Sequence, residues 1–368
     1  MKSSVLITGA ALACATLTTI TSCGIAARAR LNTTWPDVEG KDLQIPTPLS
    51  EAELESWRAE LRAQEINHAG EALAFTMVGD VRGETESTSE VSEGERMEEP
   101  PVRKEWSDPL EGADLEAEAL RRAIERGQHL SEVRLGCADC HGADYGGDLV
   151  ADAMPVWRWY APNITKGGLT KDYTAADWDR IIRHGVKPDG TNATMPAIDY
   201  QRLSDREVSD VAAFIESRPA VETVQPPTKL GPIGKALMAF KKMPLSAEMI
   251  DHSLASVALP PEEAVSVDFG EHIVQTCVGC HGGDFAGGPI AGGPPDWPPA
   301  SNLRHTEAGL LGWTEANFIT AMREGTRPDG SAINPIMPWE MLGKLSDTEL
   351  KAMWVYLSGL SDGESADE

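Results

Sequence analysis

The pattern of hydrophobic and polar positions predicts short helices separated by long loops, and it predicts them twice. In the first copy, apolar residues recur with helical spacing over about 118–130, a short helix covers 174–184, and a final helix begins after Ser204. Ser204 is a favourable N-cap because its hydroxyl can accept a hydrogen bond from a free N–H of the first turn. The second copy repeats the last two helices at 314–324 and after Ser346. No segment has the alternation typical of a strand, so each copy is predicted to be all-α.

A duplication in the sequence accounts for this recurrence. A string of the form Cys-x-x-Cys-His occurs twice at an offset of 140 residues, and Pro-Asp-Gly, Met-Pro and Leu-Ser-Asp motifs follow each copy. Repeats of this length indicate one domain-sized unit used twice. We assign residues 119–220 to a first repeat, 221–262 to a connector, 263–361 to a second repeat and 362–368 to an acidic tail. The strings are formed by Cys137, Cys140 and His141, and by Cys277, Cys280 and His281.

The spacing within each string is that of a covalent haem site. Two thiols one helical turn apart can add to the two vinyl groups of a haem, and the adjoining histidine is then directed at the iron. A redox dithiol or half of a zinc site would also use paired cysteines. Neither requires the histidine, and a four-ligand zinc site needs further cysteines that the chain lacks. We therefore predict two covalently bound haem c groups.

Each repeat also has one candidate for the second axial ligand of the iron. Met195 and Met337 lie 54 and 56 residues beyond the histidines of their strings, each in a Met-Pro pair just before the final helix. A lone methionine is usually core filler, but recurrence at matching positions favours ligation. His/Met ligation raises the reduction potential and closes the iron to exogenous ligands, which favours electron transfer over peroxide or oxygen chemistry.

Other recurrent residues are candidates for supporting roles. Arg183 and Arg323 recur, and a cation there could pair with a buried haem propionate, the alternative being a solvated surface residue. A backbone carbonyl within 162–164, matched by 301–303, could accept the Nδ1 proton of the axial histidine. Two recurring histidines precede the strings and are expected to be packed or hydrogen-bonded: His129 and His272.

The amino terminus has the character of an export signal. Residues 1–22 contain Lys2 and then an uncharged stretch that is too short and too rich in Ala, Thr and Gly for a membrane-spanning helix. The Ile-Thr-Ser-Cys-Gly run resembles the lipobox of bacterial lipoproteins. That resemblance implies lipidation of Cys23, with Gly24 favouring the outer membrane and a protein that faces the periplasm. A short membrane anchor or an ordinary cleaved signal is the alternative.

An acidic, partly disordered extension is predicted over residues 23–118. The chain has 58 acidic and 32 basic residues, for a net charge of −26, and residues 84–118 alone hold thirteen acids against three bases. Such a segment is expected to be a solvated tether, the alternative being a docking surface for a basic partner. Ser50 and Glu53 form a capping-box pattern ahead of a helix at 51–74. The acidity argues against nucleic acid as a partner.

Residues 119–361 resemble diheme class I c-type cytochromes. The run from Tyr160 through Met195-Pro196 to Asp205 is similar to the cytochrome c subunits of membrane-bound alcohol, aldehyde and gluconate dehydrogenases. This resemblance implies two tandem cytochrome c domains that relay electrons from a dehydrogenase towards quinone or a terminal oxidase. Those subunits typically have three haems and a carboxyl-terminal helix, whereas this chain has two strings and a candidate lipid anchor. The resemblance therefore implies the fold and the haem ligation, but it does not imply the dehydrogenase partner.

The favoured function is a membrane-anchored diheme electron carrier that transforms no substrate itself. It would pass single electrons between a periplasmic donor and a respiratory acceptor, and its acidic surface would steer basic redox partners. The alternative is a diheme enzyme such as a cytochrome c peroxidase or a thiosulfate or sulfite dehydrogenase subunit. A peroxidase needs one iron that can open, which the two symmetric methionines disfavour. A redox sensor would need an output domain, and none is visible.

Overall fold

The computed structural model describes residues 17–79, 108–290, 293 and 297–361. The chain forms two compact units, one of Met1–Thr47 with Leu120–Glu368 and the other of Pro48–Ala119. Most of the acidic segment 84–118, the amino-terminal part of the signal and the acidic tail lie outside the described residues. The expectations of a disordered tether and a cleaved signal therefore stay predictions.

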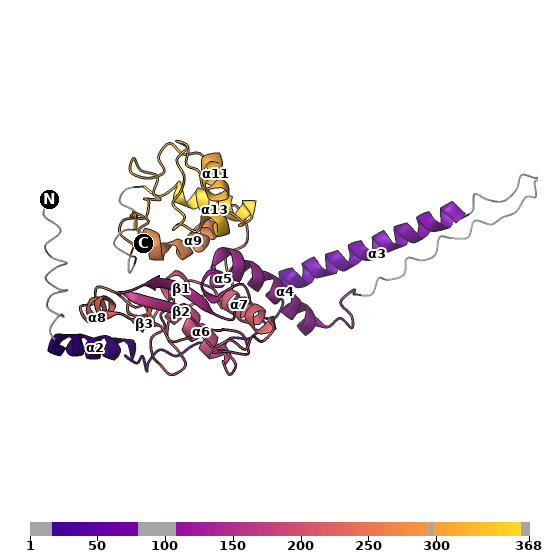
Figure 1. The fold of residues 1–368 in the computed structure, drawn as a ribbon. Coiled ribbons are helices and arrows are strands. Elements are labelled where there is room, and N and C mark those ends of the chain that lie inside the picture. Colours follow the sequence, from indigo (N-terminus) through magenta and orange to yellow (C-terminus); the bar gives the residue numbers. More distant parts are fainter. Residues whose placement is uncertain (1–16, 80–107, 291–292, 294–296, 362–368) are drawn as a thin grey trace, which may run out of the picture. The chain divides into compact units, whose positions relative to one another are not determined.

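The first repeat is a set of helices around its string (Figure 1). The helix before the string ends in one π-helical turn, and the two later helices begin with capping boxes at Thr174 and Ser204. The core contains Tyr145, Trp178 and Val208, all nearly inaccessible to solvent. The elements are α4 Leu115–His129, the π turn Leu130–Arg134, α5 Cys137–His141, α6 Ala175–His184 and α7 Asp205–Ser217.

The second repeat has the same order of elements. Its later helices are again capped by boxes, here at Thr314 and Ser346, as the recurrence of the sequence predicts. Phe285, Ile273 and Leu350 are buried in its core. The elements are α9 Val267–Val274, the 3-10 turn Gln275–Cys277, α10 Val278–His281, α11 Glu315–Glu324, α12 Trp339–Leu342 and α13 Asp347–Leu357.

A glycine allows the first and last helices of each repeat to cross closely. A Cβ on Gly127 of α4 would lie 2.0 Å from the carbonyl oxygen of Asp210, and one on Gly270 of α9 would lie 2.0 Å from that of Ala352. Any larger residue would force the helices apart. The two crossings hold the segment before each string against the final helix of the same repeat.

The expectation that no segment is a strand was wrong for one region. β1 Asp148–Ala153 and β2 Trp157–Ala161 form an antiparallel hairpin, and β3 Lys229–Leu230 of the connector pairs with β2. Most β2 side chains are half-buried regardless of which face they occupy, so the sequence lacks the apolar–polar alternation that reveals a strand. The fold is otherwise helical, in agreement with the predicted class.

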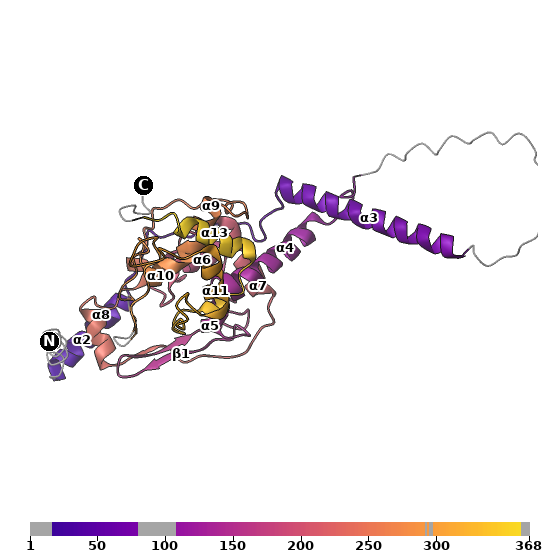
Figure 2. The ribbon, with the colours of Figure 1, turned by 90° about the horizontal axis from the view of Figure 1, so that it is seen from above.

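Two segments outside the repeats pack on the first repeat. α2 Leu17–Leu31 lies beside α8 Pro232–Ala239 of the connector in both views, where Ala27 is buried with Met238 (Figures 1 and 2). Leu43 joins the core of the first repeat. The sequence assigned residues 23–118 to one extension, whereas the structure divides that stretch after Thr47.

The second unit contains one long helix. α3 Glu51–Gly79 begins at the predicted capping box, with the Ser50 N–H donating to the Glu53 carboxylate at 2.9 Å. It extends beyond the predicted end at residue 74. Within this unit, Arg58 pairs with Asp108 at 3.3 Å. Among the helices in the described residues, none has both the length and the apolar character needed to cross a bilayer.

Candidate functional site

The cysteines of the two strings are unbonded thiols on short helices, α5 and α10, and on the turn before α10. Burial raises the pKa of Cys137 and of Cys277 to about 12. A redox dithiol needs a thiol with a lowered pKa, so these environments argue against that alternative. Where residues are described, no group of three or more His, Cys, Asp or Glu side chains is arranged to hold a metal ion. Cys23 is disulfide-bonded.

The histidine of each string is buried and held by a backbone carbonyl. His141 Nδ1 lies 2.8 Å from the Pro162 oxygen, and His281 Nδ1 lies 2.8 Å from the Ser301 oxygen. A carbonyl oxygen can only accept, so Nδ1 carries the proton and Nε2 keeps a free lone pair. Burial lowers the pKa of both rings, although this hydrogen bond opposes the shift, and so favours their neutral form. Both carbonyls fall in the predicted segments, and neutral Nε2 is the atom that binds iron.

The loop after each histidine is sharply turned in the same way in both repeats. Gly142 and Gly282 have φ values of +78° and +80°, and Tyr145 and Phe285 also adopt positive φ although they are not glycines. Both aromatic side chains are completely buried. The Gly147 N–H donates to the His141 carbonyl at 2.8 Å, which closes the loop. This aromatic pair was not foreseen from the sequence, although its members lie at the same offset as the strings.

The two candidate methionines lie in loops whose backbone is well anchored. The Met195 carbonyl accepts from the Ser246 hydroxyl of the connector at 2.8 Å and from the Ala197 N–H at 2.9 Å. The Met337 carbonyl accepts from the Trp339 N–H at 2.7 Å. Both side chains are half-buried. Ligation by these residues stays a prediction.

The candidate propionate-binding arginines contact protein groups. Arg183 is buried and donates to Asp179 at 2.5 Å, to the Leu203 carbonyl at 3.0 Å and to Asp205 at 3.0 Å. Arg323 donates to the Gly343 carbonyl and to Asp347. In both repeats the guanidinium therefore links the middle helix to the start of the final helix. These contacts favour a structural role over propionate binding.

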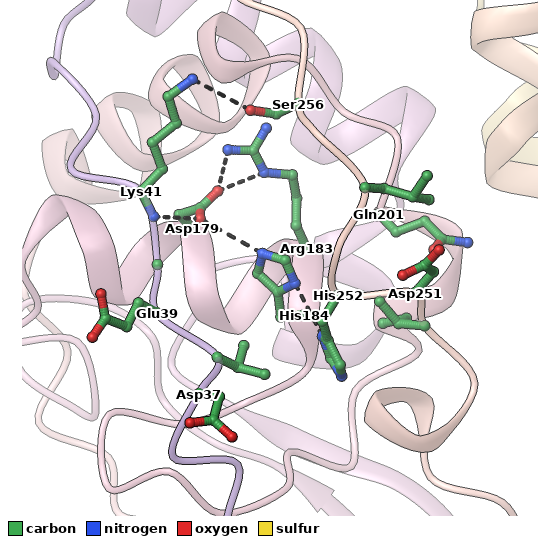
Figure 3. A pocket seen from close by; sticks show the side chains of 14 residues that line it. Asp37, Glu39, Lys41, Asp179, Arg183, His184, Gln201, Asp251, His252 and Ser256 are labelled. Atoms are coloured by element: carbon green, nitrogen blue, oxygen red, sulfur yellow. Dashed lines mark hydrogen bonds and ion pairs between the residues drawn. The ribbon is translucent and has the colours of Figure 1, made fainter.

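A cavity of about 230 Å³ lies on the first repeat, away from its string (Figure 3). His184 and His252 face each other in it, with their Nδ1 atoms 3.1 Å apart. His252 Nε2 donates to the Ala247 carbonyl at 2.9 Å, so neutral His252 accepts from His184. Burial lowers the pKa of His184. No residue of either string lines this cavity, so it is not a haem site.

Reciprocal ion pairs join the two repeats. His129 Nε2 lies 2.9 Å from Glu349 of the second repeat, and His272 Nε2 lies 2.8 Å from Glu207 of the first. The two histidines occupy equivalent positions, and so do the two glutamates, so the contacts are related as in a two-fold interface. Arg134, in the π turn, adds a buried pair with Glu207 at 2.7 Å. The predicted hydrogen bonding of both histidines is confirmed, but their partners were not foreseen.

The charges at this interface set the pKa values of its acids and bases. The hydrogen bond with Glu349 raises the pKa of His129 although burial opposes it. Burial alone would raise the pKa of Glu207, but Arg134 and His272 lower it to about 2. Each link is an ion pair when its histidine is protonated and its glutamate is charged.

Each string also contacts the loop after the methionine of the other repeat. The Gly279 N–H donates to Asp199 at 2.6 Å, and burial raises the pKa of this carboxyl to about 7 although the hydrogen bond lowers it. The equivalent of Asp199 in the second repeat is Met341, whose sulfur would be 2.7 Å from a Cβ on Gly136. Both strings therefore lie at the interface between the repeats.

The matches to known proteins cover the two repeats. Residues 124–219 and 267–361, just over half of the chain, match the family described as Cytochrome c. The cytochrome c subunit of an alcohol dehydrogenase (quinone) from Gluconacetobacter polyoxogenes is 26% identical over 268 residues, covering 64% of this chain and 56% of that protein. A gluconate 2-dehydrogenase cytochrome c subunit from Pantoea cypripedii is 29% identical over 267 residues, covering 64% and 59%. The chain thus spans less than two thirds of the length of these relatives.

Proposed function

Because the chain belongs to the cytochrome c family, we propose that its two repeats hold one covalent haem c each and that it passes single electrons between a donor and an acceptor. The observation that carries this proposal is the same in both repeats. A neutral histidine presents Nε2 beside two free thiols and is fixed by a carbonyl 2.8 Å from Nδ1. A bound haem supplies reversible one-electron exchange at its iron.

Each repeat leaves buried polar atoms that such a group could satisfy. Within the described residues, buried polar atoms without a hydrogen-bond partner include the Tyr145 and Tyr173 hydroxyls in the first repeat and the Thr306 hydroxyl in the second. Native cores rarely leave such atoms unsatisfied, so a polar group from outside the chain is expected to complete each core. Cys137, Cys140, Cys277 and Cys280 would bind the macrocycles covalently, and His141 and His281 would hold the irons.

Met195 and Met337 are proposed as the sixth ligands. Their loops are anchored through the backbone, and in the first repeat the Ser246 hydroxyl adds a hydrogen bond from the connector. A thioether on each iron would close it to peroxide and cyanide. The diheme peroxidase alternative needs one open iron, and neither repeat lacks the methionine. The electron carrier is therefore favoured.

The proposed donor is a dehydrogenase, because the relatives are named as cytochrome c subunits of alcohol and gluconate dehydrogenases. The acceptor is proposed to be a respiratory component on the same side of the membrane. Export and a lipid anchor at Cys23 on the outer membrane remain part of the proposal. The anchor requires a free thiol at Cys23, so the disulfide would have to be missing from the mature protein.

A potentiometric titration of the purified holoprotein, followed by visible spectroscopy, tests the carrier function. We expect two one-electron steps, no spectral change with cyanide and no peroxide consumption. A resting haem that binds cyanide would instead favour the enzyme. Affinity purification in mild detergent followed by mass spectrometry tests the partner, since a dehydrogenase should co-purify and its absence would remove the proposed donor.

A further inference from the structure

Two stretches of this acidic chain contain no acidic residue, and they pack against each other. Residues 17–36 and 223–247 lack Asp and Glu, whereas a stretch of the second length should hold about four at the average of the chain. The first stretch contains α2 and the second contains β3 and α8. Ala27 of α2 is buried with Met238, Met243 and Leu245 at this contact.

Five cations on these stretches have no acidic partner among the described residues. Lys229, Lys241, Lys242 and Arg28 are exposed, and Lys235 is half-buried. The remaining arginine, Arg30, is paired with Glu248 and also donates to the Met238 carbonyl, so it fastens α2 to the end of α8. A side chain at Gly24 would meet the Lys235 stem at 3.9 Å, which places this lysine next to Cys23 and Ile25. We call these five cations the α2–α8 basic cluster.

Large apolar side chains are also exposed on the same two stretches. Ile25 of α2 is 66% exposed, and on α8 and its C-cap Ile233 and Phe240 are 41% and 52% exposed. Ile233 and Phe240 are seven residues apart and therefore lie on the same face of that helix. Basic residues combined with exposed Ile and Phe on a surface helix are typical of segments that lie in a membrane interface.

We propose that the α2–α8 basic cluster and its exposed apolar side chains dock on the surface of an anionic lipid bilayer. Charge complementarity favours an anionic bilayer as the partner. The chain has a net charge of −26, so an anionic surface repels its acidic regions and is expected to approach it where acidic residues are missing. Lysine ammonium groups would lie among the anionic headgroups while Ile25, Ile233 and Phe240 insert at the level of the upper acyl chains. This contact goes beyond the proposed lipid anchor and does not require it, although acylation of Cys23 would tether the chain at the same place.

Vesicle partitioning tests the proposal. The full-chain holoprotein with Cys23→Ser, which removes any acyl chain, is compared with its Lys235→Gln/Lys241→Gln/Lys242→Gln derivative. Both are sedimented with phosphatidylcholine vesicles and with vesicles containing about 30% phosphatidylglycerol. Residues 1–22 are the same in both proteins, so their contribution cancels. A matched control removes three lysines elsewhere on the first unit: Lys166→Gln, Lys171→Gln and Lys351→Gln.

We expect the parent to bind anionic vesicles more tightly than phosphatidylcholine vesicles. Each lysine removed should lower the partition coefficient on anionic vesicles about fivefold. Added salt should reduce the difference between the parent and the triple variant. Phe240→Ser should weaken binding to both kinds of vesicle. The proposal is overturned if the triple variant binds like the parent, or if the control loses as much, since net charge alone would then explain the result. Haem content and reduction potentials should not change in any variant, so failure here leaves the electron-transfer function standing.

Discussion

The two repeats share their haem-binding geometry but differ in how they are covered. In the first, Asp179 and Arg183 are only 1% and 3% exposed, because the backbone N–H of Lys41 reaches Asp179 at 2.7 Å and the connector packs nearby. In the second, the equivalent Arg323 side chain is 34% exposed, and its partner Asp347 is 73% exposed. The histidine–carbonyl distance is nevertheless 2.8 Å in both repeats. The local segment, and not the covering layer, sets the geometry of the site.

The contact between the repeats shows a second difference. The two histidine–glutamate pairs are equivalent, but only the first repeat has the π turn that brings Arg134 to Glu207. The sequence places this turn where the first copy has three extra residues before its string. One side of the interface is therefore a buried charge network, and the other is a single pair with a half-buried histidine.

Removing the cysteines of one string should have the largest effect. We expect Cys137→Ala/Cys140→Ala and Cys277→Ala/Cys280→Ala each to lose one of two covalent haems, because each string serves only its own repeat. Pyridine haemochrome assays per mole of purified chain measure this. If either double variant keeps the parental haem content, that string is not an attachment site.

The two interface glutamates should differ in their contribution to stability. Glu207→Gln leaves Arg134 as a buried charge without its partner, and we expect a loss of about 3–5 kcal/mol. Glu349→Gln breaks only the pair with His129, and we expect about 1 kcal/mol. Denaturant unfolding of the holoprotein measures both, with Glu324→Gln as a control at an exposed helical glutamate. Equal losses would contradict the asymmetry of the interface.

The two methionines should act on separate haems. Met195→Ala and Met337→Ala are each expected to lower one of the two reduction potentials by on the order of 100 mV and to leave the other nearly unchanged. A spectroelectrochemical titration resolves the two steps. Met154→Ala, at an exposed methionine of the first repeat, is the control. A variant that shifts neither step would remove that methionine as a ligand.

A smaller effect is expected on the pH dependence of stability. The raised pKa of His129 means that its contribution is fully present below about pH 6.5 and is lost as the pH rises through the folded pKa. The pKa of Asp199, raised by burial to about 7, acts in the same direction, because the folded state binds its proton more tightly than the unfolded state. The buried histidines whose pKa is lowered act in the opposite direction, so the contribution of His129 and Asp199 is isolated by comparison with a variant that lacks both groups. Between about pH 5.5 and pH 8 the melting temperature of the parent should fall relative to that variant by a few degrees.

The double variant His129→Gln/Asp199→Asn is the control for this prediction. Both replacements are uncharged and keep hydrogen-bonding groups, so the slope of melting temperature against pH should be more positive in the variant than in the parent over this range. An unchanged slope would show that other groups cause the pH dependence.

The sequence was sufficient to predict features that depend on residues close together in the chain. The strings, the capping boxes at Ser204 and Ser346, and the carbonyl segments that hold the histidines follow from residue type, spacing and recurrence. The sequence was not sufficient where contacts join distant segments. His129 and Glu349 are 220 residues apart, and no periodicity relates them. Likewise, nothing in the sequence of α2 predicts that this helix packs against α8.

The stoichiometry and spin state of the haems test the central claim most directly. Purified holoprotein is assayed by pyridine haemochrome and by intact mass after denaturation, and its ferric form is studied by electron paramagnetic resonance and near-infrared absorption. We predict two haems that remain attached on denaturation, both low-spin and with the near-infrared band of methionine-bound ferric iron. One haem per chain, haem released on denaturation, or a high-spin ferric signal would contradict the account.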